Sequence, residues 1–232
     1  RSNDLQPGHR IIVFDYQGNR SGQHARNFLG GWQGHLMVDD YNGYKALFVG
    51  DGNNTACTEL ACLAHIRRKF FGLYQANQSP MAKVALEKIT DLYAIEAEAK
   101  EFALEQREHI RQDKAKPLLD ELHTWLQDTL ANTAPGGTSA KALGYALKRW
   151  PALIRYADTG HLPIDNNACE NTIRPIAVGR KNYLFVGTER AGKRAAAIQS
   201  LLGTAKLNGL DPAAWLTDTL EKLPTWPNSK ID

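Results

Sequence analysis

The stretch His35-Leu36-Met37-Val38-Asp39-Asp40 decides the fold class, because an apolar run ends there in two carboxylates. Such a run predicts a short strand. Working outward, the β-branched and apolar residues 11–16 predict an earlier strand, and residues 58–63 predict a third. A short helix over residues 25–29 and a helix over residues 65–74 are expected between and after them. Strands that alternate with helices indicate an α/β core.

The middle of the chain, from residue 79 to about residue 158, has helical signals throughout. Apolar residues such as Leu119, Leu122 and Leu126 recur at the spacing of one helix face. Breaks are expected at residues 135–137 (Pro-Gly-Gly) and at residues 150–151 (Trp-Pro). We interpret this region as three or four helices whose apolar stripes form a core.

The last third returns to shorter elements. Residues 163–167 lead into a helix that Pro175 is expected to end or kink, because proline lacks the N–H group and clashes one turn back. Residues 182–186 are predicted to be extended. A longer helix should follow and close at Gly209, and a final helix should begin with Asp211 as its cap and proline behind it.

Composition is that of an ordinary globular protein, with 232 residues, 43% hydrophobic and 23% charged. No apolar run approaches the roughly 18 residues of a membrane helix, and no secretory signal opens the sequence. The three cysteines are too few for a disulfide framework and suit a reducing compartment. These features predict a cytoplasmic protein with no membrane partner.

The net charge is only +3, but basic residues gather in two places. Such clusters are expected of phosphate contacts, although a solvated basic surface explains them equally well. The first cluster contains one acidic residue and the basic residues Arg174, Arg180, Lys181, Arg190, Lys193 and Arg194, and the second is Arg67-Arg68-Lys69.

Asp39 and Glu170 are the candidate catalytic carboxylates. A strand that ends in one carboxylate, met by a second from a helix, can bind Mg²⁺ or Mn²⁺ in a two-metal phosphoryl-transfer site. Asp39 also fits a simple turn after a strand. Glu170 also fits the third position of a capping box that starts at Asn167. The residues alone leave both alternatives open.

Two further motifs contain metal-binding or phosphate-binding residue types. Cys62 and His65 have the spacing of a metal-ligand pair, but a closed zinc site needs four ligands. A buried cysteine with a core histidine is the favoured interpretation, and a metal site is the alternative. Residues 187–193 match the Gly-x-x-x-x-Gly-Lys of a P-loop, yet Arg194 stands where a Ser or Thr must bind Mg²⁺. Nucleotide binding that depends on Lys193 is a third hypothesis for function.

Six stretches in order resemble the catalytic region of insertion-sequence 66 transposases. No single stretch is decisive, but the ordered set is specific and extends over nearly the whole chain. The stretches are residues 14–16 with 20–22, residues 38–44 (Val-Asp-Asp-Tyr-Asn-Gly-Tyr), residues 62–71, residues 162–170 (Leu-Pro-Ile-Asp-Asn-Asn-Ala-Cys-Glu), residues 174–182 and residues 205–210.

The resemblance implies an RNase H-like α/β core, incomplete at the N-terminus, with a large all-α insertion, so that the chain is helix-dominated overall. The expected boundaries are residues 1–76 for the first part of the core, 77–160 for the insertion, 161–223 for the second part with the Glu170 helix, and 224–232 for a loose tail.

The resemblance also implies a DNA transposase that cleaves and transfers strands with Mg²⁺ or Mn²⁺. Asp39 matches the second and Glu170 the third member of an Asp-Asp-Glu triad, and both would bind metal. The implied partners are the inverted-repeat ends of an insertion sequence, the target DNA and further copies in a homo-oligomer, at the nucleoid of a bacterial cell. The two basic clusters would contact phosphates.

The first aspartate of the triad is the main departure from the family pattern. No stretch here matches the motif that contains it, and Asp40 stands where the family more often has glycine. We therefore expect a fragment. The second hypothesis for function is a catalytically inactive remnant that still binds DNA or an intact protomer.

Overall fold

The computed structural model describes residues 1, 10–49, 57–179, 186–227 and 229. They form two compact units. The first, which we call the helical unit, is Ser21–Asn167, and the second, the terminal unit, is Arg1–Arg20 with Ala168–Asp232. Helices dominate the described residues, as the sequence predicts.

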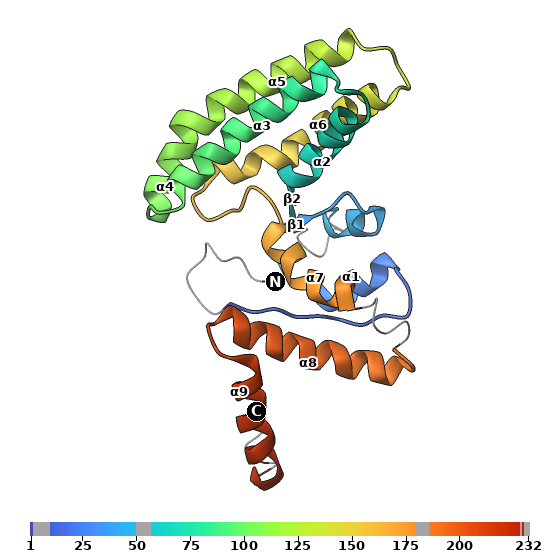
Figure 1. The fold of residues 1–232 in the computed structure, drawn as a ribbon, viewed down its shortest axis with the longest axis vertical. Coiled ribbons are helices and arrows are strands. Elements are labelled where there is room, and N and C mark those ends of the chain that lie inside the picture. Colours follow the sequence, from blue (N-terminus) through green and yellow to red (C-terminus); the bar gives the residue numbers. More distant parts are fainter. Residues whose placement is uncertain (2–9, 50–56, 180–185, 228, 230–232) are drawn as a thin grey trace. The chain divides into compact units, whose positions relative to one another are not determined.

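Four long helices of the helical unit form a closed ring, in which α2 packs on α3, α3 on α5, α5 on α6 and α6 on α2 (Figure 1). Phe70, Ile89 and Leu143 are among the side chains fully buried between them. The helices predicted for residues 79–158 are thus confirmed. The bounds are α2 (Leu63–Asn77), α3 (Pro80–Ala99), α4 (Leu104–Ile110), the π-turn η2 (Arg111–Ala115), α5 (Lys116–Ala131), α6 (Thr138–Leu153) and the 3-10 turn η3 (Ile154–Asp158).

A two-stranded parallel sheet joins this bundle. Strand β1 (His35–Val38) has the predicted bounds, and β2 (Thr58–Ala61) covers most of the predicted third strand. Val38 pairs with Ala61 at the ends of the strands, and β2 contacts α6. The predicted early helix is α1 (Gly22–Leu29), which precedes the 3-10 turn η1 (Asn42–Leu47).

The prediction of a strand at residues 11–16 is wrong, because this segment pairs with no other strand in the described part of the chain. The segment runs along α8 (Figure 1), and side chains of that helix take its backbone hydrogen bonds. Ile12 bonds Thr204 Oγ1 through its N–H at 3.0 Å and its C=O at 3.1 Å, and the Phe14 N–H donates to Ser200 Oγ at 2.7 Å. The apolar pattern predicts an extended backbone correctly, but it does not say which groups satisfy that backbone.

The terminal unit contains α7 (Asn167–Gly179), α8 (Glu189–Leu207), α9 (Pro212–Lys222) and the 3-10 turn η4 (Leu223–Thr225). Asp211 caps α9 as predicted, accepting the Ala214 N–H at 2.7 Å. Gly209 follows the end of α8 with φ at 79°. The predicted extended segment at 182–186 lies almost wholly outside the described residues.

The predicted break at residues 150–151 is wrong, and Pro175 does not end its helix, although the kink predicted there as the alternative stays a prediction. Pro175 lies inside α7, which continues to Gly179, and Pro151 lies inside α6, which continues to Leu153. The carbonyl that loses its donor to Pro175 belongs to Asn171, whose exposed position lets water take the place of the missing N–H. No helix in the described part of the chain is long and apolar enough to cross a membrane.

Candidate functional site

Two adjacent carboxylates follow β1, and they have different partners. Asp39 is exposed, and its Oδ1 accepts the Tyr41 N–H at 3.2 Å. None of the ion pairs between described residues includes Asp39. Asp40 instead accepts Lys148 Nζ at 2.8 Å and Arg149 Nη1 at 3.4 Å, both from α6. The charge of Asp40 is therefore neutralised by the bundle, while the carboxylate of Asp39 remains open to a cation.

Arg149 connects both strands to the bundle. Its side chain is 7% exposed, and the same Nη1 lies 2.6 Å from Glu59 Oε1 on β2. Arg155 also donates to the carbonyl of Glu59. A buried network of this kind fixes the groups that it joins, because an unpaired charge there is costly. Sequence reasoning missed Arg149, although it follows Ala146 by three residues on the buried stripe of α6.

The segment that leads to Glu170 is fixed to the start of α2. The Cys62 thiol donates to Asn166 Oδ1 at 3.0 Å and accepts the Asn166 N–H at 3.3 Å. The Leu63 N–H donates to the carbonyl of Ile164 at 3.1 Å. Burial raises the pKa of the Cys62 thiol, so it stays protonated at neutral pH.

A metal at Cys62 and His65 stays an untested alternative. The Cys62 thiol is engaged with Asn166, and His65 lies half-buried in the first turn of α2. Over the described ranges, no three His, Cys, Asp or Glu side chains gather as a metal site.

Asp165 fixes the position at which α7 begins. Its Oδ2 accepts the Tyr93 hydroxyl and Asn167 Nδ2, each at 2.7 Å, and its Oδ1 accepts the Asn167 N–H at 3.0 Å. Burial, and then the bond to Asp165, raises the pKa of Tyr93, which therefore remains a donor. Glu170 lies half-buried three residues into α7, in the terminal unit. Its pairing with Asp39 across the two units stays a prediction.

Arg111 holds the loop that precedes this segment. The side chain is fully buried and forms a two-bond fork with Glu96, at 2.8 and 2.6 Å. Its Nη1 donates to the carbonyls of Tyr156 and Leu162, both at 2.9 Å. Sequence reasoning missed Arg111 as well, although it precedes the buried Ala115 by one helical turn.

The predicted phosphate-binding residues lie on exposed helix surfaces where they are described. Arg174 is exposed on α7, and Arg190, Lys193 and Arg194 are exposed at the start of α8. Arg67 and Arg68 are exposed on α2, whereas Arg180 and Lys181 fall outside the described residues. The lysine of the P-loop-like motif, Lys193, pairs with Glu189 at 2.7 Å on the helix surface.

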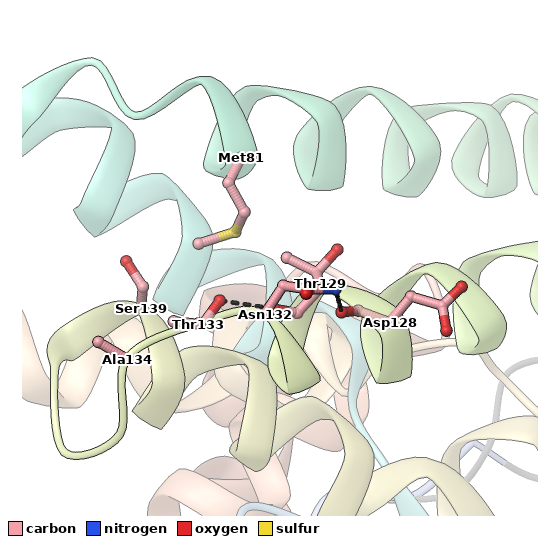
Figure 2. Close-up of a pocket in the computed structure, with 7 residues that line it drawn as sticks. All are labelled: Met81, Asp128, Thr129, Asn132, Thr133, Ala134 and Ser139. Carbon is pink, nitrogen blue, oxygen red and sulfur yellow. Dashed lines mark hydrogen bonds between the residues drawn. The ribbon is translucent and has the colours of Figure 1, made fainter.

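The helical unit has a hollow of about 560 Å³ between the start of α3 and the turn from α5 to α6 (Figure 2). Met81 points toward it from α3. Thr133 Oγ1 bonds the carbonyl of Thr129 at 2.6 Å, and Asn132 Nδ2 bonds that of Asp128 at 2.8 Å. These polar groups are satisfied by their own helix, and the hollow contains no candidate catalytic residue.

Two models of known protein families match this chain. The family model described as "Transposase IS66 family" matches residues 1–194, and the model "IS66 C-terminal element" matches residues 200–232. The chain therefore belongs to the IS66 transposase family, which confirms the resemblance seen in the sequence.

Curated relatives from Sinorhizobium fredii include the uncharacterized proteins y4hP and y4jD. The protein y4hP is 32% identical, and the match covers 94% of this chain and 42% of y4hP. The protein y4jD is 34% identical, and the match covers 94% of this chain and 43% of y4jD. The chain thus spans less than half the length of these relatives. No solved structure matches it.

Proposed function

We propose that this chain is the catalytic part of a DNA transposase that cleaves and transfers strands with a divalent cation, on an RNase H-like core. The observation that carries the proposal, beside the family membership, is the difference between the two carboxylates after β1. Asp40 is neutralised by Lys148 and Arg149, whereas Asp39 takes part in no ion pair within the described residues.

The chemistry of Asp39 suits a magnesium or manganese ligand. Its Oδ1 is oriented by the Tyr41 N–H, and the second oxygen is open. Carboxylate oxygens are the ligands that these cations prefer. Glu170 is proposed as the ligand from α7. A bound ion would lower the pKa of an attacking water or hydroxyl and stabilise charge at phosphorus.

The basic residues of α7, α8 and α2 are proposed to hold DNA phosphates. Contacts to phosphate set affinity and position, and they do not read sequence. The element ends, the target DNA and further copies of the enzyme are the proposed partners of the full-length protein.

The second candidate function is DNA binding without strand transfer. It is favoured by the basic residues that are exposed on α2, α7 and α8, because contacts to phosphate need no metal ion. A chain of this kind would act through its DNA contacts or through an intact protomer.

Calorimetric titration with Mn²⁺ separates the two candidates. We expect Asp39→Asn and Glu170→Gln each to weaken binding by at least about tenfold, the lower bound for disturbing a metal site. Asp91→Asn, an exposed carboxylate on α3, is the matched control and should bind as the wild type does. Mn²⁺ binding that both site variants leave unchanged would reject the catalytic proposal in favour of the second candidate.

A further inference from the structure

A second hollow of the helical unit, of about 420 Å³, lies between α2 and α3. We call it the α2–α3 pocket, and we propose that it binds an unpaired nucleotide of single-stranded DNA. The proposal rests on the proposed function only in taking DNA as the ligand, since the pocket requires no metal. The pocket is lined by Ala64, Arg67, Arg68, Phe71, Tyr93 and Asn167.

Two aromatic side chains give the pocket surfaces on which a base can stack. Phe71 is 43% exposed, so that part of its ring is accessible to a ligand. Tyr93 is held in place because its hydroxyl donates to Asp165 at 2.7 Å. A ring that is already fixed loses little conformational entropy when a ligand binds. Stacking of a base on an aromatic ring needs no particular sequence.

Two cationic side chains line the same pocket, and one of them, Arg67, lies over the ring of Phe71. Arg67 is one helical turn before Phe71, and its guanidinium carbon lies 5.6 Å from the ring centroid. No ion pair in the described part of the chain involves Arg67, so its charge is not neutralised by a carboxylate. Arg68 lines the same pocket. Arginine next to an exposed aromatic ring is the combination that binds the backbone and bases of single strands.

The size of the pocket favours one unpaired nucleotide over a duplex. Its volume falls within the range of about 300–1,000 Å³ typical of small-ligand pockets. In a duplex the base faces are covered by neighbouring bases, so that they become available to Phe71 only when a nucleotide leaves the stack. The pocket therefore predicts a preference for single strands, or for the frayed end of a duplex.

Fluorescence anisotropy with a labelled single strand of about 16 nucleotides, the upper site size of a binding module, tests this directly. The chain is titrated in EDTA, beside a blunt duplex of the same sequence. We expect Phe71→Ala to weaken single-strand binding by about 5- to 150-fold, the effect of one stacked base, and to leave duplex binding unchanged. Phe102→Ala is the matched control, since Phe102 is 44% exposed in the same unit and lies outside the pocket.

The dependence on salt separates the roles of the two side chains. Arg67→Gln should lower the slope of log K against log salt by about 0.7, the value for one phosphate contact on a single strand, whereas Phe71→Ala should leave the slope unchanged. Equal losses on single strand and duplex, an equal loss with Phe102→Ala, or equally strong competition by polyglutamate would each overturn the proposal.

The Mn²⁺ titration of the same variants keeps this proposal apart from the proposed function. Phe71→Ala is expected to bind Mn²⁺ as the wild type does. Suppose that Phe71→Ala does not weaken single-strand binding, while Asp39→Asn does weaken Mn²⁺ binding. This result would reject the nucleotide pocket and leave the proposed function standing.

Discussion

Replacing Arg111 by alanine should destabilise the helical unit by about 3–5 kcal/mol, the cost of breaking a buried ion pair by removing one partner. The magnitude follows from the surroundings of the side chain. Arg111 is 0% exposed and its partner Glu96 only 14% exposed, so alanine leaves a largely buried carboxylate without its fork of two bonds. Two backbone carbonyls, of Tyr156 and Leu162, lose a charged donor at the same time.

Two companion variants test the reasoning behind this number. Arg111→Lys keeps the charge but not the planar fork, so its loss should be intermediate. Adding Glu96→Gln to Arg111→Met removes the lone charge, and this pair should be more stable than Arg111→Ala. The free energy of unfolding of the helical unit alone is obtained by unfolding the chain in urea and monitoring hydrogen exchange in peptides of α3 and α5. A loss below about 1 kcal/mol for Arg111→Ala, the level of an exposed pair, would refute the argument.

Three further predictions concern packing, pH and reactivity. Gly160→Ala should destabilise the helical unit in thermal unfolding, because a Cβ there would clash with the carbonyl oxygen of Leu104. Gly144→Ala, with open space at its Cβ, should instead stabilise α6 by about 0.4–1 kcal/mol, and equal effects of the two variants would contradict this. The side chain of His35 is exposed, but partial desolvation, followed by the neighbouring imidazole of His161, lowers its pKa below 6.5. The unfolded chain therefore binds more protons below about pH 6.5, and stability should fall on acidification from about pH 7.5 to about pH 5.5, less so in His35→Gln; an unchanged pH profile in that variant would exclude this origin. Since burial raises the pKa of Cys62, peptide mapping should show its alkylation at neutral pH only after urea is added, and rapid labelling of the native chain would contradict its burial.

Much of the local structure could be predicted because it depends on local signals. The bounds of β1, the cap at Asp211 and the stop at Gly209 all follow from side-chain spacing and backbone preferences. Residues 11–16 show the limit of such signals. Their pattern predicts an extended chain, but Ser200 and Thr204, which bond its backbone, lie far away in the sequence. A periodic pattern carries no information on which distant element supplies the partners.

The place of Asp39 directly after β1 was predicted for the same reason, whereas its role as a metal ligand stays a prediction. Asp39 could be found because a carboxylate at the end of a strand is a local pattern. The side chains that give Asp40 a different role could not, since Lys148 and Arg149 become its neighbours only when α6 packs beside the sheet. An arginine within an apolar stripe, as at Arg111 and Arg149, is the kind of sequence signal that predicts a buried ion pair.

The helical bundle fixes the segments of backbone that lie next to both candidate carboxylates, Asp39 and Glu170. On one side, Arg149 fixes Asp40 and β2, and thereby the backbone that carries Asp39. On the other, Arg111 and Tyr93 fix the segment that ends at Asn167, where the helix of Glu170 begins. A change deep in the bundle should therefore weaken Mn²⁺ binding without touching either proposed ligand. Arg149→Gln is expected to do so at temperatures where the helices remain folded by circular dichroism, and undiminished Mn²⁺ binding in that variant would show that the bundle does not position Asp39.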